Sequence, residues 1–395
     1  MNAMRFGRWP FRRRQQRPSV DVLFYAPYVS ELLRPGGSVP SGGAETQIVL
    51  IAKLLAGAGM RVAIVAYEQP QGLPAEVAGV LIVARPVRRR GGPLSRKLRE
   101  VATLCAALGR VDAAVIVQRA MGIETSIVAL YARATRRRFV YSSASITDFA
   151  PERLLERLSV ALHSSGVLLA HAIVVQTEEQ RALCKQRFRR NGIVIRSVAE
   201  SAPLTDQPAR AFLWIGRTAF YKQPLVYIEL ARALPEVQFE MVAVADPSPD
   251  GQSLYARVQE AAQRLSNLKL IAPRPRAQLA PLMAQAVAIV NTSQFEGMPN
   301  TLLEGWAHGV PALVFEHDPD GLVSRNALGG VAAGSPALLA ELAGQMWRER
   351  HDRVDLAERC RAYVRREHAP ARIAEQWHSV FASQMTSPRR SGWRR

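Results

Sequence analysis

Two glutamates eight positions apart, Glu296 and Glu304, bound the segment of this sequence that is best suited to chemistry. The residues between them are Gly297, Met298, Pro299, Asn300, Thr301, Leu302 and Leu303. Such a segment predicts a sharp loop that runs into a helix, whose first N–H groups have no partner within the helix. We expect the N–H groups of residues 297–302 to face an anion or sugar hydroxyls. Thr301 and Glu304 also fit a capping box, in which the glutamate is structural, whereas capping requires nothing of Glu296.

A second pair of charged residues, Arg217 and Lys222, follows a predicted strand at 211–215. The arginine offers a planar fork of donors and the lysine a point charge, so the two together could clamp a diphosphate. Two solvated cations in a loop are the alternative interpretation, and the pair alone does not decide between them.

A third segment, at 36–45, is rich in glycine and precedes the first predicted helix with Gly42 and Gly43. Glycines at a helix start let backbone N–H groups approach an anion, which the helix dipole also favours. The spacing matches neither GxGxxG nor a P-loop, because no Gly-Lys-Ser/Thr follows. A plain turn is the alternative.

These segments belong to a sequence in which short β-branched runs alternate with longer helical stretches, as is typical of parallel α/β sheets. The predicted strands are 20–25, 61–66, 80–83, 113–117, 139–142, 172–176, 211–215, 238–244, 268–271, 287–290 and 312–315. The predicted helices include 43–56, 94–108, 224–234, 252–265 and 278–285, and residues 335 to about 382 are helical. A polar, proline-containing stretch at 192–208 interrupts the alternation and is the predicted linker.

We therefore predict an α/β protein of two Rossmann-like, doubly wound domains that face a cleft, at 19–200 and 209–368. Residues 369–385 are expected to form a C-terminal helix that packs back across the domains, between basic tails at 1–18 and 386–395. Ligands of such sheets lie beyond the carboxyl ends of the strands. The three segments all fall at such positions.

The 395 residues carry a formal net charge of +19, to which the arginines of the two tails contribute ten. Trp9, Phe11 and Trp393 are interleaved with these arginines. This composition suits an anionic membrane surface or nucleic acid, and a solvated tail is the third interpretation. No apolar run reaches the roughly 18 residues needed to span a bilayer, and no apolar stretch follows the first arginines as in a secretory signal. We expect a cytoplasmic protein.

The three cysteines, Cys105, Cys184 and Cys360, lie far apart in segments predicted to be helical. Their odd number and their spacing argue against disulfides and against zinc. We expect buried or partly buried thiols in a reducing compartment.

In their order along the chain, the Gly-Gly, Gly-Arg…Lys and Glu-x7-Glu segments resemble the GT-B glycosyltransferases, specifically the large retaining class called family 4. The resemblance covers most of the chain, and its third segment is the most specific. It implies transfer of a sugar from a nucleotide-diphosphate sugar, a co-substrate, to a glycan, glycolipid or other lipid-linked acceptor, with retention of configuration. It implies no bound cofactor, and polysaccharide or glycolipid assembly at the inner face of a membrane is the usual setting.

The resemblance also implies roles for individual residues. Arg217 and Lys222 would neutralise the leaving diphosphate, and Glu296 would act beside the transferred sugar, so these three are the predicted catalytic residues. Glu304 would accept the ribose hydroxyls. The remaining donor-binding residues would be Gly42, Gly43, Pro273, Arg274, Gly297, Met298, Pro299, Asn300, Thr301 and Leu302, of which Pro273 and Arg274 would read the base edge.

The sequence departs from the family pattern in two places. Many relatives carry a histidine in the first domain that faces the reacting sugar, but residues 140–148 contain none. Asp148 is the nearest ionisable candidate for orienting the acceptor, or else a solvated or capping residue. The family's usual Gly-Gly…Glu signature is replaced by Asp-Pro-Asp-Gly at 318–321. This resembles a manganese-binding Asp-x-Asp, but it is also a strong turn sequence. Because two cations already supply a metal's charge, we expect no metal and activity that survives EDTA.

Two other classes of function stay open. A nucleotide-sugar isomerase or epimerase of the same architecture would keep the diphosphate site but needs acid and base groups around the sugar. A non-catalytic basic protein would bind nucleic acid or anionic glycans, although paired glutamates repel a polyanion. The absence of GxGxxG argues against a dehydrogenase. The sugar, the base, the acceptor, the linkage formed and the oligomeric state are not readable from the sequence.

Overall fold

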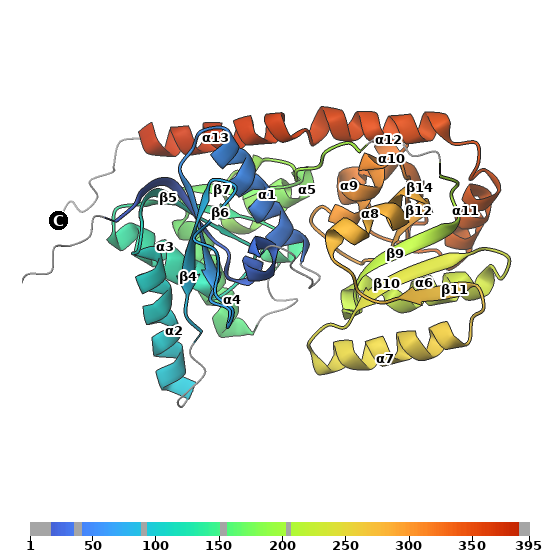
Figure 1. The fold of residues 1–395 in the computed structure, drawn as a ribbon, viewed down its shortest axis with the longest axis horizontal. Helices are drawn as coiled ribbons and strands as arrows, with labels where there is room; N and C mark the ends of the chain where they lie inside the picture. The colour runs from blue at the N-terminus through green and yellow to red at the C-terminus, as the bar shows by residue number, and fades with distance from the viewer. Residues whose placement is uncertain (1–16, 35–41, 88–92, 151–155, 203–206, 387–395) are drawn as a thin grey trace, which may run out of the picture.

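The structure is a computed structural model that describes residues 17–34, 42–87, 93–150, 156–202 and 207–386. Figure 1 shows two α/β domains side by side, with two consecutive C-terminal helices lying along them. This arrangement agrees with the predicted fold class of two parallel-sheet domains.

The first domain is built on an eight-stranded sheet in the order β3-β4-β2-β1-β5-β6-β7-β8, parallel except for the pair β3 and β4. Its strands are β1 (Ser19–Tyr25), β2 (Val62–Tyr67), β3 (Glu76–Val77), β4 (Val80–Arg85), β5 (Asp112–Arg119), β6 (Arg138–Ser142), β7 (Ala172–Val175) and β8 (Ile193–Val194). Its helices are α1 (Gly43–Gly57), α2 (Pro93–Leu108), α3 (Glu124–Ala134), α4 (Arg157–Leu169) and α5 (Glu178–Phe188), with 3-10 turns η1 (Pro27–Leu33) and η2 (Ile146–Asp148). The central strands read as continuous apolar runs because apolar clusters cover both faces of the sheet.

The second domain has a six-stranded, all-parallel sheet in the order β11-β10-β9-β12-β13-β14. Its strands are β9 (Ala211–Arg217), β10 (Phe239–Val244), β11 (Leu268–Ile271), β12 (Ala286–Asn291), β13 (Ala312–Val314) and β14 (Gly329–Val331). Its helices are α6 (Pro224–Ala233), α7 (Pro249–Gln263), α8 (Ala280–Ala284), α9 (Asn300–Ala307), α10 (Leu322–Arg325), α11 (Pro336–Arg348) and α12 (Val354–Glu367). Three 3-10 turns, η4 (Phe220–Lys222), η5 (Arg276–Gln278) and η6 (Pro319–Gly321), lie in its loops.

The last helix, α13 (Pro370–Thr386), returns to the first domain and packs against α1 (Figure 1). Its Trp377 and Phe381 are at most 2% exposed and lie in the same apolar cluster as Phe24 of β1. The rings of Phe24 and Phe381 meet edge to face with centroids 6.4 Å apart. The first and last segments of the described chain therefore share one core.

The chain passes between the domains twice, after β8 and between α12 and α13, and the two passages are joined by hydrogen bonds. His368 Nδ1 lies 2.7 Å from the carbonyl oxygen of Ser197, and the N–H of Ala199 donates to the carbonyl oxygen of His368 at 3.1 Å. His368 is fully buried at this crossing. The two connections thus form one junction.

Some elements differ from the sequence prediction. The predicted linker at 192–208 contains β8, which adds a short strand to the edge of the first sheet. The strand β14 was not predicted because it is three residues long and two of them, Gly329 and Gly330, have low strand propensity; pairing with β13 supplies its stability. The predicted helix at 278–285 is divided into η5 and the shorter α8.

The cysteines agree with prediction: Cys184 and Cys360 are buried, Cys105 is partly exposed, and all three are unpaired. Over the residues that the structure describes, no helix combines the length and the hydropathy needed to cross a bilayer.

Candidate active site

The largest group of predicted site residues lines a cavity of about 360 Å³ between the domains. The first domain contributes the start of α1, the end of β5 and residues that follow β6 and β7. The second contributes the ends of β9 and β10 and the loops after β11 and β12. The cavity therefore lies at the carboxyl ends of both sheets, where doubly wound proteins bind their ligands. The predicted residues at its wall are Gly42, Gly43, Arg217, Lys222, Arg274, Glu296, Met298, Pro299, Asn300, Thr301 and Glu304.

Four predicted residues, Pro273, Gly297, Leu302 and Asp148, are not among those that line this cavity. Leu302 is fully buried in the core of the second domain, and its N–H donates to the carbonyl oxygen of Pro299 at 3.2 Å. The expectation that this N–H is available to a ligand is therefore wrong. Gly297 abuts the first domain so closely that a Cβ there would lie 2.3 Å from the carbonyl oxygen of Ala144.

Lys222 and Glu296 form an ion pair at the cavity wall. Their side chains are 24% and 15% exposed, so the pair is shielded from bulk water on most sides. Ser293 Oγ donates to Glu296 Oε1 at 2.8 Å, and Thr292 Oγ1 donates to the carbonyl oxygen of Lys222 at 2.6 Å. Arg217 ends β9 at the same cavity and is exposed. Two cations thus reach the site from one connection of the second domain, between β9 and α6.

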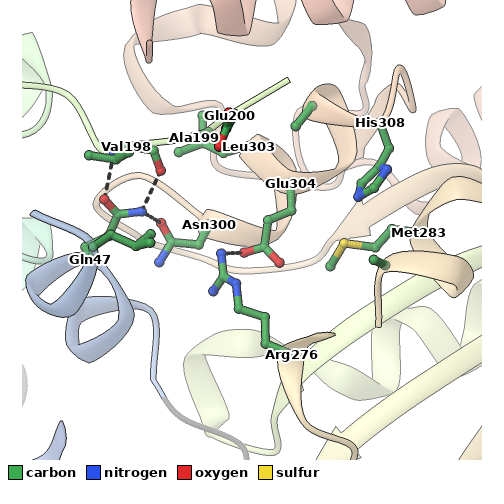
Figure 2. Close-up of a pocket in the computed structure, with 13 residues that line it drawn as sticks. Gln47, Val198, Ala199, Glu200, Arg276, Met283, Asn300, Leu303, Glu304 and His308 are labelled. Atoms are coloured by element: carbon green, nitrogen blue, oxygen red, sulfur yellow. Dashed lines mark hydrogen bonds and ion pairs between the residues drawn. The ribbon is translucent and has the colours of Figure 1, made fainter. Parts of the chain in front are cut away.

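A second ion pair joins Glu304 of α9 to Arg276 of η5, and Figure 2 shows the two side chains pointing toward each other. Burial raises the pKa of Glu304 to about 7, while Arg276 opposes that shift. The capping-box interpretation of Thr301 and Glu304 is wrong, because α9 begins at Asn300 with Pro299 before it. Glu304 lies one turn inside the helix, and its carboxylate is directed to a side chain.

The N-terminal ends of α1 and α9 meet across the cleft. Gln47 Nε2 donates to Asn300 Oδ1 at 3.2 Å and to the carbonyl oxygen of Val198 at 2.9 Å, contacts drawn in Figure 2. A Cβ on Gly43 would lie 2.3 Å from Asn300 Nδ2, so any larger residue there would displace the Asn300 amide. Because both helix dipoles are positive at these ends, the shared cavity favours an anion.

Sequence analysis missed Arg119, at the end of β5. It lines the main cavity and a smaller one of about 180 Å³ in the first domain, whose wall includes Tyr25, Glu45 and Glu124. Burial lowers the pKa of Arg119 to about 10, and the charges of Asp148 and Glu45 oppose that shift. Its Nε has no hydrogen-bond partner among the described residues. A charged residue at the carboxyl end of the strand next to β1 was the available signal.

Arg276 was also not predicted, because it lies in a proline-rich loop where no neighbouring residue in the sequence points to a partner for it. Gln176, Ser145 and Tyr221 complete the polar wall of the cavity. These side chains are spread over three loops, so no local spacing in the sequence connects them.

The structure does not support an acceptor role for Asp148. Its side chain is 2% exposed, and its Oδ2 accepts from the N–H of Ala144 at 2.7 Å, which closes the turn after β6. Burial raises the pKa of Asp148, and the charge of His163 opposes this. The residue holds the loop that carries Ala144 and Ser145 to the cavity.

The carboxylates of the Asp-Pro-Asp-Gly loop bind backbone N–H groups. Asp318 accepts from Val323 and Ser324 at the start of α10, at 2.9 and 3.1 Å. Asp320 accepts from Glu178 and Glu179 at 2.8 Å each, so it caps α5 of the other domain. The loop is thus a contact between the domains, and its residues are not among those that line the cavity of about 360 Å³. Over the described ranges, no group of three or more His, Cys, Asp or Glu has a metal-binding arrangement.

The fold and the cavity define a class, the GT-B glycosyltransferases, and comparisons with known proteins agree. Residues 42–196 match the family described as "Glycosyl transferase 4-like domain", and residues 209–349 match "Glycosyl transferases group 1". The two matches take up most of both domains. The chain belongs to the group 1 glycosyltransferases.

Solved structures share this fold at low identity. Sucrose-phosphate synthase from Thermosynechococcus elongatus superposes with a TM-score of 0.75 and 13% identity over 92% of this chain and 98% of that one. HepE from Anabaena, in complex with UDP and glucose, gives 0.73 and 16% over 92% and 100%. The lipopolysaccharide outer core galactosyltransferase WaaB gives 0.61 and 14% over 92% and 99%. Among curated proteins, none matches the sequence significantly.

Proposed function

We propose that this chain transfers a glycosyl group from a nucleoside-diphosphate sugar to an acceptor hydroxyl, without a metal ion and with retention of configuration, as in family 4. The observation that supports this most directly is the convergence of Arg217, Lys222 and Glu304 with the N-terminal ends of α1 and α9 on one cavity. In the reaction the bond between the anomeric carbon and the diphosphate oxygen breaks, and its electron pair stays on the diphosphate. The acceptor oxygen bonds to the anomeric carbon and releases its proton to the phosphate or to solvent.

Lys222 and Arg217 stabilise the charge that develops on the leaving diphosphate. A fixed donor in a water-poor site is worth about 2.7–4 kcal/mol to such a transition state. When the donor binds, the diphosphate replaces Glu296 as the partner of Lys222. Glu296 is then available to a hydroxyl of the transferred sugar. Because two side-chain cations carry out the neutralisation, we expect EDTA to leave the rate unchanged.

Glu304 binds the ribose of the donor. Its carboxylate reaches the cavity from α9 and is held there by Arg276. The ribose hydroxyls would donate to Glu304 either beside Arg276 or in its place. The loop of Pro273 and Arg274 reads the base edge through backbone groups, and the N–H groups of Gly42 and Gly43 meet the diphosphate from the first domain.

The acceptor is a glycan or a lipid-linked sugar, and it enters through the smaller cavity of the first domain. Tyr25 and Tyr28 supply aromatic surface there, and Glu45 and Glu124 supply acceptors for hydroxyl groups. Arg119 lies between this cavity and the donor cavity. The enzyme would work in the cytoplasm at the inner face of a membrane. The basic tails that suggested this lie outside the described residues.

A thermal-shift screen against UDP-, GDP-, ADP- and TDP-sugars tests the donor site directly. HepE holds UDP and glucose in its solved structure, which makes UDP-sugars the first to test. A donor at 100 times its Kd stabilises the folded state by about 2.7 kcal/mol, which gives a readily measured rise in Tm. The Lys222→Ala variant should lose the shift, and the Lys269→Ala variant, which changes an exposed lysine of β11, should keep it. A screen in which no donor raises Tm would contradict the proposal.

A further inference from the structure

The exposed large apolar side chains of the described residues are concentrated on one part of the first domain. Eight of the fourteen lie on α2, α3 and α4 or at the residue before α3. On α3 and α4 they are Ile123, Leu130, Leu158, Leu162, Leu168 and Leu169, with exposed fractions from 37% to 71%. Scattered single apolar residues need no explanation, but a cluster of this kind marks an interaction surface.

The apolar residues of α4 form a stripe along the helix that the exposed Ser165 interrupts. Leu158, Leu162 and Leu169 recur at helical spacing on the exposed side, while His163 and Val167 on the other side are fully buried. Between Glu156 and the end of the helix, the only charged residue is Arg157. A solvated helix would carry polar residues on this side, so the stripe is not explained by the fold.

The stripe continues onto α3, because the two helices cross in close contact. A Cβ on Gly166 would lie 2.5 Å from the backbone N of Ser126, so the crossing requires glycine. The hydroxyls of Ser126 and Ser165 lie 2.9 Å apart at the exposed edge of the crossing. Leu130, one turn after Ser126, is 56% exposed on the adjoining surface. We call this joint surface of α3 and α4 the apolar face.

Basic residues outnumber acidic ones on the helices that carry the apolar face and on the neighbouring α2. Residues 93–110, 123–138 and 156–169, which include the three helices, contain nine arginines and lysines against three glutamates. Arg96 and Lys97 are exposed on α2, Arg133 on α3, and Arg157 at the start of α4. Apolar side chains beside cations are typical of helices that lie in the interface of an anionic bilayer.

We propose that the apolar face binds the surface of an anionic lipid bilayer, with its leucines inserted among the headgroups. A symmetric dimer through the same face would bring its arginines against their own copies, so the charge disfavours a second copy as the occupant. Ile123 adjoins Glu124, which lines the smaller cavity of the first domain. A bilayer on this face therefore lies beside the entrance proposed for the acceptor. The surface itself is inferred from exposure and charge, and binding can be measured without a donor.

The test is flotation of the full-length protein with vesicles of phosphatidylcholine alone or mixed with phosphatidylglycerol. We expect binding to the mixed vesicles, and roughly a tenfold or greater loss of bound fraction for Leu158→Ser/Leu168→Ser, because two inserted side chains are lost. The matched control Ile193→Ser/Val354→Ser removes two exposed apolar side chains elsewhere and should bind like wild type. All variants keep both arginine tails, so the tails do not account for a difference between them.

Three outcomes would overturn the proposal. In the first, the leucine variant binds as well as wild type. In the second, all proteins lose binding equally in high salt with no difference between leucine variant and control, which would assign binding to the tails. In the third, sedimentation shows a concentration-dependent dimer that the leucine variant alone loses, without vesicle binding. Circular dichroism and Tm of each variant confirm that it is folded.

Discussion

The two domains present different chemistry to the cavity they share. The second domain contributes two ion pairs, Lys222 with Glu296 and Arg276 with Glu304, and the exposed Arg217 beside them. The first domain contributes backbone N–H groups at Gly42 and Gly43 and the arginine Arg119, whose Nε has no partner among described atoms. An anionic ligand would therefore have to break the two ion pairs of the second domain. The groups of the first domain could bind it without the loss of an ion pair.

This difference indicates which part of the binding free energy is offset by the loss of existing contacts. A paired cation gives up its carboxylate before it can stabilise a diphosphate, so part of the electrostatic gain offsets that loss. In the proposed reaction, each released carboxylate binds a hydroxyl of the donor. The ion pairs thus hold these side chains in position at the cavity wall.

Lys222→Ala should have the largest effect. We expect turnover to fall roughly a hundredfold or more, because a fixed cation is removed from the leaving group. Since Glu296 loses its counter-charge, Tm should also fall slightly. Single-turnover kinetics with saturating donor measures the first effect, and a near-normal rate in the folded variant would refute the assigned role.

Arg119→Gln tests the cation that the first domain brings to the cavity, whose Nε lacks a hydrogen-bond partner among the described residues. A charge-assisted hydrogen bond is worth about 1.5–3 kcal/mol, so kcat/KM should fall by roughly ten- to a hundredfold. Tm should not fall, because burial already opposes the charge of Arg119. Arg119→Lys, which keeps the charge, should recover part of the rate. Equal rates for wild type and Arg119→Gln would remove the residue from the site.

The pH dependence of donor binding tests Glu304, whose pKa burial raises to about 7. The carboxylate is protonated as pH falls through that value, and it then accepts fewer hydroxyl hydrogen bonds. Apparent Kd should rise about tenfold between pH 8 and pH 6 if only the ionised form binds. The Glu304→Gln variant should bind weakly and show a flat profile, measured by titration calorimetry. A wild-type profile that is equally flat would contradict this role.

The same shift has a consequence for stability. The folded-state pKa of Glu304 lies above its unfolded value, so ionisation is more costly in the folded protein. Its contribution to the free energy of unfolding therefore decreases as pH rises from about 4.5 to about 7.

Asp320→Asn should have the smallest effect, because it weakens a contact between the domains and leaves the cavity wall unchanged. Loss of a helix cap costs about 1 kcal/mol, and asparagine keeps the left-handed backbone that residue 320 adopts at φ 54°. Amide hydrogen exchange at Glu178 and Glu179 should accelerate. Asp318 instead accepts from the start of α10 in its own domain. The comparison variant Asp318→Asn should therefore leave the amides of Glu178 and Glu179 protected.

Much of this arrangement was predictable because it depends on local patterns. Alternating strands and helices specify two parallel sheets. Residues that end or follow the strands of such sheets, here Gly43, Arg217 and Glu296, lie at the carboxyl edge of their own sheet. The Glu-x7-Glu spacing identified Glu304 although its capping interpretation was wrong, since the helix starts two residues earlier than that motif requires.

The remaining features depend on contacts between distant segments. Arg276 acquires its importance from a glutamate on another element, and Arg119 from the junction of two cavities. Asp320 resembled a metal ligand until the structure placed the start of α5 against it. Asp148 was the candidate for orienting the acceptor because its burial depends on the packing of the whole domain, which the local sequence does not show.

The helix α13 means that the first domain is finished last during synthesis. The ribosome releases β1 to β8 long before residues 370–386 emerge, so the groove that Trp377 and Phe381 later fill faces water in the interval. A nascent chain stalled after β14 would hold a complete second sheet beside a first domain with an open hydrophobic groove. That intermediate is where chaperones would be expected to bind.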